Sequence, residues 1–407
     1  MKVLYCNPSF WDYRLPFYKR LNELFEGKFY VVYSTKRYHG RKTLLERIKR
    51  VLGENALPYD NELMFDVKKR SFNGFTEGGK QIPLPFKLLH IIHKAKPDVL
   101  ITEGFFQWTP FVILYSFLFQ VPVFMGYERT LWTERNNGKI KTWHRKLTDK
   151  FITGYLVNGS ETKKYLMSIG VNEEKIHIGG MNADSEGLRN DVSRFRNSLE
   201  FQNFKNGIIN SGIKLTKYYS GTNKGIVYLF SGRVSVLKGA DLLLAAWEKH
   251  IGKYPNDHII LIGYGDKSEE LKAKYINEKS IHLEGRIDYT QVHKYYAIAD
   301  VFILPTLTDN WSLVIPEAMS CGLPVATSIY NGCYPELVHE GENGYTFDTF
   351  KQDSILQALD YFHHVDLKSH GLKSIELEKK FNTEACAKRE YDGVMKLSKR
   401  VKYIELE

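Results

Sequence analysis

The segment from Val301 to Ala326 constrains the fold most, because it places a helix between two short apolar runs. The first run, Val301–Leu304, enters a polar turn, and the helix that follows stops at Gly322, just before the second run, Pro324–Ala326. Apolar strands joined through a helix are typical of a parallel sheet whose two faces are both covered. The segment therefore predicts a strand–helix–strand unit and an α/β fold.

The same alternation of strands and helices runs through both halves of the chain. The strands predicted in the first half are Lys2–Cys6, Phe29–Tyr33, Val99–Thr102, Val121–Met125 and Gly154–Asn158. The helices predicted there include Leu15–Leu24, Pro85–Lys94 and Ser160–Ile169, the last ending at a Gly170 cap. The strands predicted in the second half are Ile226–Phe230, His258–Ile262, Ile281–Glu284, Val301–Leu304 and Pro324–Ala326. We expect two parallel sheets with right-handed crossovers.

Three other segments complete this outline. Pro110–Phe124 is strongly apolar but is interrupted by polar residues and a proline, which predicts a buried helix followed by a strand. Residues 185–222 are rich in Asn, Ser and Gly and predict the join between two domains, with room for a helix within it. The tail from Thr383 to Val401 is predicted to be a helix.

Length and composition are typical of an ordinary globular protein. A chain of 407 residues predicts two or three domains, each large enough for its own core. The four cysteines have no paired spacing, and the thirteen histidines have no metal-ligand spacing. The first apolar run is too short for a signal peptide. We therefore expect a cytoplasmic protein that needs neither a metal nor another cofactor.

Two carboxylates flank the turn after Val301–Leu304. Asp309 lies in the turn, and Glu317 follows after seven residues, on the predicted helix. Ligands of open α/β sheets bind beyond the carboxyl ends of the strands, where this turn lies. The backbone N–H groups of Asn310, Trp311 and Ser312 would face the same crevice and suit an anion or a sugar hydroxyl. A simpler interpretation is a helix-capping aspartate followed by an incidental glutamate.

The run Glu317-Ala-Met-Ser-Cys-Gly-Leu-Pro-Val325 resembles a signature of the retaining glycosyltransferases of family 4. Further matches in the same order are Phe230-Ser-Gly-Arg233, Lys238-Gly239, Ile262-Gly263-Tyr-Gly265, Leu283-Glu-Gly285, Asn331-Gly332, Pro335-Glu336 and Glu340-Gly-Glu-Asn-Gly344. The first 200 residues match much more loosely. The resemblance implies the GT-B fold, in which two Rossmann-like, doubly wound parallel-sheet domains face each other across a cleft.

The resemblance also implies a domain plan. Residues 1–200 would form an acceptor-binding Rossmann-like domain, and residues 201–385 a nucleotide-sugar-binding one. Residues 386–407 would form a terminal helix that packs back onto the first domain.

The donor-site residues follow from the same resemblance. Arg233 and Lys238 match the basic pair of the family and would hold the diphosphate of a nucleotide sugar. Asp309 would contact the transferred sugar, and Glu317 the ribose. The glycines that would line the donor pocket are Gly232, Gly263 and Gly265. The chain departs from the family pattern in having Asp309 where glutamate is usual and Ser312 where glycine is usual.

The acceptor-side candidates come from the first half. Asn7 and Arg14 follow the first strand, where the family often has a glycine-rich loop that this chain lacks. Glu128 and Arg129 follow the strand Val121–Met125 and would reach the same crevice. An equally good interpretation is that Glu128 is buried in a structural ion pair with Arg129 or another base.

The activity that these residues imply is transfer of a hexose-type sugar, with retention, from a nucleotide diphosphate sugar. The resemblance favours a UDP-sugar over a GDP-sugar, and a glycan or polyprenyl-linked acceptor in polysaccharide, lipopolysaccharide or glycoconjugate synthesis. Two alternatives stay open, a nucleotide-sugar epimerase and a catalytically inactive sugar-nucleotide-binding module of the same fold.

The basic excess lies entirely in the first half. Residues 1–200 hold 32 Lys+Arg and 21 Asp+Glu, whereas residues 201–407 hold 25 and 26. Two basic clusters stand out, Lys36–Arg50 with an apolar stripe from Leu44 to Leu52, and Arg135–Lys150 with Trp143. Such helices suit the anionic inner face of a membrane, although each could instead be a solvated helix that packs its stripe on the core. No nucleic-acid motif accompanies the charge, so we expect no nucleic-acid partner.

Overall fold

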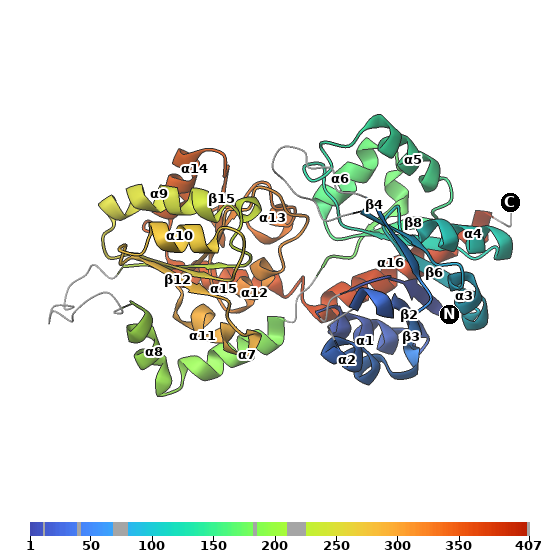
Figure 1. The fold of residues 1–407 in the computed structure, drawn as a ribbon, viewed down its shortest axis with the longest axis horizontal. Coiled ribbons are helices and arrows are strands. Elements are labelled where there is room, and N and C mark those ends of the chain that lie inside the picture. Colours follow the sequence, from blue (N-terminus) through green and yellow to red (C-terminus); the bar gives the residue numbers. More distant parts are fainter. Residues whose placement is uncertain (11–12, 39–41, 68–79, 182–184, 210–224, 405–407) are drawn as a thin grey trace. The chain divides into compact units, whose positions relative to one another are not determined.

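The computed structural model describes residues 1–10, 13–38, 42–67, 80–181, 185–209 and 225–404. The chain forms two compact units, each built around its own parallel sheet (Figure 1). The first unit comprises Met1–Gly180 and Thr383–Glu407, and the second comprises Met181–Asn382.

The first unit contains a seven-stranded parallel sheet in the order β3-β2-β1-β6-β7-β8-β9. Its strands are β1 (Val3–Cys6), β2 (Phe29–Ser34), β3 (Ala56–Tyr59), β6 (Val99–Glu103), β7 (Val123–Tyr127), β8 (Gly154–Val157) and β9 (Ile176–Ile178). A separate antiparallel pair consists of β4 (Leu63–Val67) and β5 (Lys80–Leu84). The strand order reverses direction between β1 and β6, which is the arrangement of a doubly wound fold.

Helices cover both faces of this sheet. They are α1 (Arg14–Leu24), α2 (Lys42–Leu52), α3 (Leu88–Ala95), α4 (Thr109–Phe119), α5 (Lys139–Asp149), α6 (Ser160–Ser168) and α16 (Thr383–Ile404). Helix α1 packs against α2 and α16, while α3, α4 and α6 contribute apolar side chains to the core on the opposite face of the sheet. Helix α16 comes from the end of the chain and packs against α1, β8 and β9.

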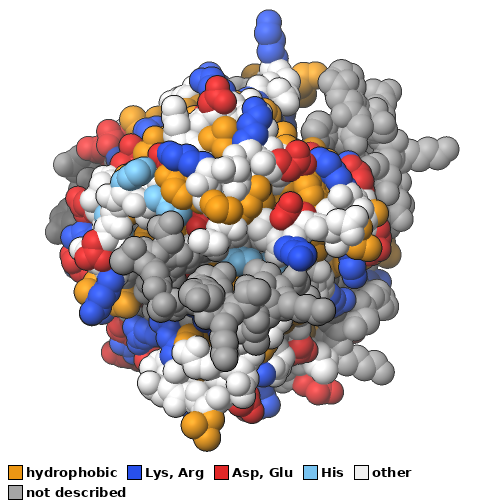
Figure 2. Space-filling view, turned by 90° about the vertical axis from the view of Figure 1, so that its left-hand side faces the viewer, with side chains coloured by type: hydrophobic (Ala, Val, Ile, Leu, Met, Phe, Trp, Pro, Cys, Tyr) orange, Lys and Arg blue, Asp and Glu red, His pale blue; other side chains and the backbone are white. Residues whose placement is uncertain are grey.

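The second unit contains a six-stranded parallel sheet in the order β12-β11-β10-β13-β14-β15. Its strands are β10 (Val227–Ser231), β11 (His258–Ile262), β12 (Ile281–Gly285), β13 (Val301–Leu304), β14 (Val325–Ser328) and β15 (Gly344–Phe347). Its helices are α7 (Ser185–Arg196), α8 (Glu200–Ile209), α9 (Ala240–Lys253), α10 (Ser268–Lys274), α11 (Tyr289–Ile298), α12 (Val314–Ser320), α13 (Tyr334–Leu337), α14 (Gln352–Tyr361) and α15 (Leu367–Glu378). Acidic and basic side chains are intermixed on the face of this unit that Figure 2 shows.

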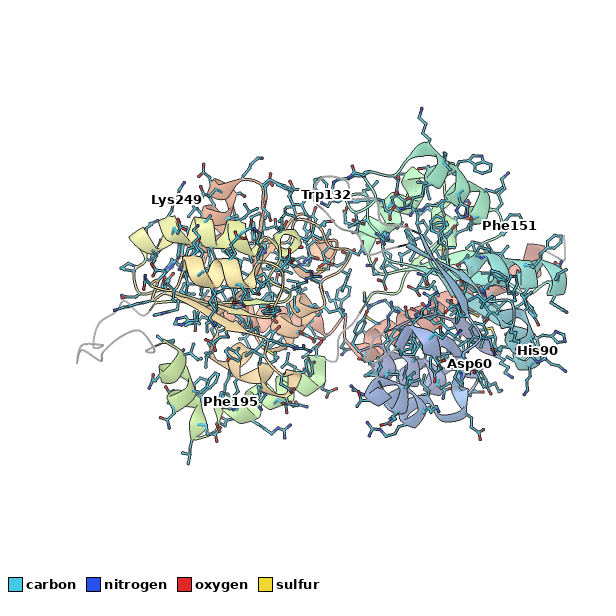
Figure 3. The ribbon with its side chains drawn as sticks, viewed as in Figure 1. Asp60, His90, Trp132, Phe151, Phe195 and Lys249 are labelled. Carbon is cyan, nitrogen blue, oxygen red and sulfur yellow. The ribbon has the colours of Figure 1, made fainter. Side chains whose placement is uncertain are left out.

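Residues 185–209 form part of the second unit rather than a join between units. Helix α7 packs against α11 and α12. The Arg196 guanidinium donates hydrogen bonds to the carbonyl oxygens of Tyr296, Ala297 and Cys321, which ties the end of α7 to that unit. Phe195 of α7, labelled in Figure 3, makes an edge contact with Phe204 of α8. The division between the units therefore lies at Gly180 instead of residue 200.

Most predicted strands and helices are present, with small shifts that have local causes. Strand β7 begins at Val123, because Pro122 cannot donate a backbone hydrogen bond to the sheet. Gly170 has the positive φ of a helix cap, at 96°. Strands β3, β4, β5, β9 and β15 were not predicted. β3 contains Pro58, which is tolerated at the edge of the sheet, and β9 has only three residues.

The prediction that Pro110–Phe124 begins with a buried helix is wrong in one respect. Helix α4 is followed by β7 as expected, and Val112 and Tyr115 are buried, but Leu114 and Phe117–Phe119 are exposed to solvent. The apolar stripe of α2 behaves differently, because Ile48 and Leu52 are buried against the core. Among the described residues, no helix has both the length and the apolar character needed to cross a membrane.

Candidate active site

Two loops at the carboxyl ends of β10 and β13 bring Lys238 and Asp309 into contact. The backbone N–H of Leu307 donates to the carbonyl oxygen of Leu237 at 2.9 Å, and the Thr306 hydroxyl donates to the same oxygen at 3.1 Å. This attachment places Lys238 beside the polar turn, where its Nζ donates to Asp309 Oδ2. The ion pair is partly buried, with side-chain exposures of 26% for Lys238 and 18% for Asp309.

The Asp309 carboxylate also organises the turn that carries it. Its Oδ1 accepts the backbone N–H of Trp311 at 3.2 Å, and its Oδ2 accepts the hydroxyl of Ser312. Leu313, rather than Asp309, is the N-cap residue of α12, so the helix-cap interpretation of Asp309 is wrong. The carboxylate instead closes a short turn in front of the helix and holds an ammonium group.

The loop after β14 supports the same turn. The backbone N–H of Asp309 donates to the carbonyl oxygen of Tyr330 at 3.2 Å, and Gly332 N–H donates to the carbonyl oxygen of Asp309 at 3.1 Å. Asn331 is buried, and its side-chain oxygen accepts the Ser312 N–H at 3.3 Å. The sequence shows Asn331 only as part of a family match and does not indicate this positioning role.

The three residues after Asp309 differ in what they offer a ligand. The N–H groups of Trp311 and Ser312 are used inside the protein, by Asp309 and Asn331. The Trp311 ring is buried and lies 5.9 Å from that of Phe381. Asn310 is half-buried. Backbone contacts from Trp311 and Ser312 to a sugar would therefore require these internal hydrogen bonds to be shared or exchanged.

The predicted glycine turns pack against each other without room for side chains. A Cβ atom on Gly263 would lie 1.8 Å from the carbonyl oxygen of Gly232, and one on Gly265 would lie 2.2 Å from that of Val234. Gly263 also has a φ of 129°, which side-chain-bearing residues rarely adopt. The glycines therefore allow the chain to turn tightly at the ends of β10 and β11.

The two predicted phosphate-binding bases have different surroundings. The Arg233 side chain is 70% exposed and approaches Asp266 at 3.7 Å, a loose surface pair. Lys238 is held by Asp309 in the short turn before α9. Helix α9 begins at Ala240, directly after Gly239, and its first N–H groups have no side-chain cap. This end of α9 adds positive potential near Lys238.

Glu317 lies on α12 and contacts a buried tyrosine that the sequence does not indicate. The Tyr296 hydroxyl lies 3.4 Å from Glu317 Oε2 and is also hydrogen-bonded to Ser231 at the end of β10. Burial, together with the nearby Glu317 carboxylate, raises the pKa of Tyr296 well above its ordinary value, so the phenol stays protonated and can donate. Tyr296 thus links Glu317 to the strand end that precedes the Gly232 turn.

The acceptor-side candidates in the first unit do not form one group. Arg14 and Glu128 form an ion pair, with side-chain exposures of 15% and 29%. Arg129 instead pairs with Glu134 at 3.2 Å. Asn7 is buried, and its side-chain nitrogen donates to the Tyr18 hydroxyl at 2.9 Å. The sequence left open a structural ion pair between Glu128 and a base, and in the structure this base is Arg14.

Two acidic residues that sequence reasoning missed lie near this pair. The Tyr5 hydroxyl donates to Glu103 at the end of β6, and desolvation raises the pKa of Glu103. Glu390 of α16 is buried, and desolvation, with Glu103 and Glu128 adding to it against the effect of Arg14, raises its pKa to about 7. Glu390 interrupts a stripe of buried apolar residues on α16. A charged residue within such a stripe can be recognised in the sequence and indicates a buried carboxyl group. This stripe comprises Cys386, Ala387, Val394 and Leu397.

The raised pKa of Glu390 predicts that the free energy of unfolding depends on pH. Its folded pKa of about 7 lies above the ordinary value of 4.5, so the unfolded chain releases its proton first and folded stability falls as the pH rises from about 4.5 to about 7. Glu390→Gln should remove this loss and raise the free energy of unfolding at pH 8 by at most about 3 kcal/mol, with little change near pH 4. Denaturant unfolding of the wild-type protein and the variant at pH 8 and at pH 4 measures this difference in the free energy of unfolding. Asp392→Asn, an exposed change on the same helix, should show no such difference, and an equal effect of the two variants would contradict the prediction.

Comparison with known protein families finds a match in the second unit. Residues 219–379 match the family described as glycosyl transferases group 1. The matched residues lie within the second unit. Similar curated proteins are an uncharacterized glycosyltransferase of Haemophilus influenzae, 29% identical over 151 residues, and the alpha-monoglucosyldiacylglycerol synthase of Acholeplasma laidlawii, 26% identical over 203 residues. The matched segments cover 36% and 45% of this chain.

The chain matches only 40% and 50% of the length of these two relatives, and the matches therefore concern a domain. Solved structures extend the likeness over both units. Anabaena HepE in complex with UDP has a TM-score of 0.71 at 14% identity and covers 97% of this chain and 100% of its own. The lipopolysaccharide outer core galactosyltransferase WaaB has a TM-score of 0.68 at 13% identity and covers 97% and 99%. At these identities the likeness shows the fold, which is GT-B, and the match to the group 1 family lies in its second unit.

Proposed function

We propose that the protein is a retaining glycosyltransferase of family 4 that transfers a hexose-type sugar from a nucleotide diphosphate sugar to a glycan or polyprenyl-linked acceptor. The observation that carries the proposal is the placement of Lys238. An aspartate on a neighbouring loop holds this ammonium group, and Lys238 lies in the segment that joins the Gly232 turn to the start of α9. A cation next to a helix N-terminus at this edge of a parallel sheet suits a diphosphate.

The roles that we propose for the other residues follow the chemistry of such a donor. Negative charge grows on the diphosphate as the glycosidic bond breaks, and Lys238 and Arg233 would stabilise it. Glu317, oriented by Tyr296, would accept the ribose hydroxyls, and Asp309 would contact the transferred sugar. Retention would follow from attack on the face that the diphosphate leaves, with the leaving phosphate taking the acceptor proton. We propose no metal and no other cofactor in these steps.

A UDP-sugar is the donor that we favour, and one observation on related proteins supports it. HepE, which shares the fold, has been solved with UDP and with UDP-glucose. WaaB is named as a galactosyltransferase of the lipopolysaccharide outer core, and the Acholeplasma relative as a glucosyldiacylglycerol synthase. These names support surface-glycan or lipid acceptors for this chain, and a cytoplasmic enzyme associated with the inner face of the membrane.

A panel of UDP-, GDP- and ADP-sugars, each incubated with the purified protein, tests the proposal. Release of nucleoside diphosphate with a product of the same anomeric configuration as the donor supports retaining transfer. Recovery of an isomerised nucleotide sugar would instead identify an epimerase. Binding of a nucleotide sugar without turnover on any acceptor tested would identify an inactive binding module.

One cluster outside the proposed site resembles a metal-binding group. Asp257 Oδ2 lies 2.8 Å from His250 Nε2 and 2.7 Å from His363 Nε2. Two imidazole N–H groups that each donate to the carboxylate account for these distances. The other oxygen of Asp257 accepts the backbone N–H of Ile226, at the start of β10. We therefore assign the cluster to the stability of the second unit.

A further inference from the structure

Helix α5 exposes the apolar side of an amphipathic pattern and buries the polar side. Ile140 is 85% exposed, Trp143 is 64% exposed, and Leu147 is also exposed. Steps of three and four residues place these side chains on one stripe of the helix. The opposite side buries Arg145 and Thr148. A surface helix of a soluble protein ordinarily has the reverse orientation.

A buried ion pair fixes this orientation. Arg145 donates to Glu134 Oε2 at 2.7 Å, and its guanidinium lies 5.3 Å from the ring centres of Phe105 and Tyr165. Both charged side chains are nearly inaccessible to solvent, at 3% and 1%. Turning the apolar stripe inward would break this pair and leave a charge buried without its partner, which is strongly unfavourable. The exposed stripe is therefore a stable feature of the fold.

Helix α4 adds a second exposed apolar surface. Its inner side packs Val112 and Tyr115 into the core, while Phe117 is 66% exposed and Leu118 60% exposed on the outside. The helix carries no charged residue. A helix that is apolar on every side normally lies within a core or a lipid phase. The fold supplies a core on only one side of α4.

The two helices belong to one face of the first unit. They are the successive crossovers β6–α4–β7 and β7–α5–β8 between neighbouring strands. Phe106, just before α4, stacks on His144 of α5 with ring centres 4.7 Å apart. Phe151, just after α5, is also exposed and lies in the same region (Figure 3). We call this surface the docking face, comprising Leu114, Phe117, Leu118, Ile140, Trp143, Leu147 and Phe151.

Lysines line the docking face. Lys139, Lys146 and Lys150 are exposed, and each directly precedes a residue of the α5 stripe or Phe151. Within the part of the chain that the structure describes, none of these three lysines has an ion-pair partner. The acidic residue on α5, Asp149, is paired with Lys175 at 3.2 Å. The charge around the docking face is therefore positive and uncompensated.

We propose that the docking face binds the surface of an anionic lipid bilayer, with the apolar side chains entering the headgroup region and the lysines contacting lipid phosphates. Exposed aliphatic and aromatic side chains, including a tryptophan, bordered by lysines are the composition of interfacial membrane-binding helices. Of the two basic clusters identified in the sequence, the proposal keeps the one on α5, adds α4, and excludes α2, whose apolar stripe is partly buried. It rests on the proposed function only for the lipid-linked acceptor, because binding to a bilayer needs no sugar transfer.

Co-sedimentation with vesicles tests the docking face without any donor or acceptor. Vesicles of phosphatidylcholine with 30% phosphatidylglycerol should bind the wild-type protein, and binding should weaken at higher salt. The variant Ile140→Ser/Trp143→Ser/Leu147→Ser and the variant Lys139→Glu/Lys146→Glu/Lys150→Glu should each bind at least tenfold more weakly. Matched controls are Ile276→Ser/Leu372→Ser, exposed apolar residues of the second unit, and Arg47→Glu/Lys49→Glu/Arg50→Glu on α2.

Both controls should bind like the wild-type protein, and circular dichroism should show that every variant is folded. Equal loss of binding in the α2 variant would overturn the assignment to α4 and α5. Equal binding to vesicles with and without phosphatidylglycerol would exclude the role of the lysines. A lipid-free dimer that the serine variant abolishes, with no vesicle binding, would show instead that the face binds a second copy of the chain. Failure of glycosyl transfer with normal vesicle binding would count against the proposed function alone.

Discussion

Glu317→Ala is expected to reduce turnover by several orders of magnitude while leaving the melting temperature nearly unchanged. Glu317 is partly exposed on α12, so its removal leaves no sizeable cavity. Its contact with Tyr296 is long, at 3.4 Å, and contributes little to stability. A carboxylate that holds the ribose, by contrast, positions the donor for reaction, and misplacing a donor lowers the rate steeply.

Initial rates with the active nucleotide sugar and thermal unfolding of the same samples measure both effects. Glu376→Ala is the matched control, because Glu376 is exposed on α15 in the same unit and pairs with Lys373 at the surface. Near-normal turnover of Glu317→Ala would remove Glu317 from the site. A large fall in melting temperature together with the loss of activity would show that Glu317 is a structural partner of Tyr296.

Lys238→Ala is expected to remove about 2–4 kcal/mol of transition-state stabilisation. This loss lowers kcat/KM by roughly 30- to 1000-fold. The ammonium is partly desolvated and faces the place where we propose that the diphosphate gains charge. The variant also leaves Asp309 without its cation, and Asp309 holds the turn through Trp311 and Ser312. Lys238→Arg separates the two effects, because it keeps the positive charge beside Asp309 but changes its shape and reach.

A partial recovery by Lys238→Arg would indicate a role in phosphate binding. Asp309→Glu is the companion variant, since it restores the residue that is usual in the resembled family. The longer carboxylate is expected to shift the preference among donor sugars while activity persists. Complete loss of activity without any change in preference would argue against a contact between Asp309 and the sugar.

The sheets could be predicted from the sequence because their strands are short, apolar and separated by helices. The central strands β1, β6, β10 and β13 show this plainly. The edge strands β3 and β9 of the first sheet could not be predicted, because β3 contains a proline and β9 is very short. The division at Gly180 was missed because the Asn- and Ser-rich composition of residues 185–209 conceals two helices that pack on the second unit.

The candidate site could be predicted in part. The glycine turns and the paired acids are visible as motifs, whereas the contact between Lys238 and Asp309 depends on backbone hydrogen bonds between Leu237 and Leu307. An amphipathic pattern identifies an apolar stripe but not the side of the helix that faces the core. In α2 the stripe is partly buried, and in α5 it is exposed, because the Arg145–Glu134 pair occupies the inner side.

Titration calorimetry with UDP tests the central claim most directly, because it measures binding of the diphosphate without requiring the acceptor. Wild-type protein should bind one UDP per chain, and Lys238→Ala should bind it at least tenfold more weakly. Lys249→Ala is the matched control, since Lys249 lies exposed on α9, the helix that follows the site (Figure 3), and donates a hydrogen bond to Gln352. Binding by the control should equal that of the wild-type protein. Equal affinities of wild-type protein and Lys238→Ala would contradict the account, and would show that the diphosphate is not held at Lys238.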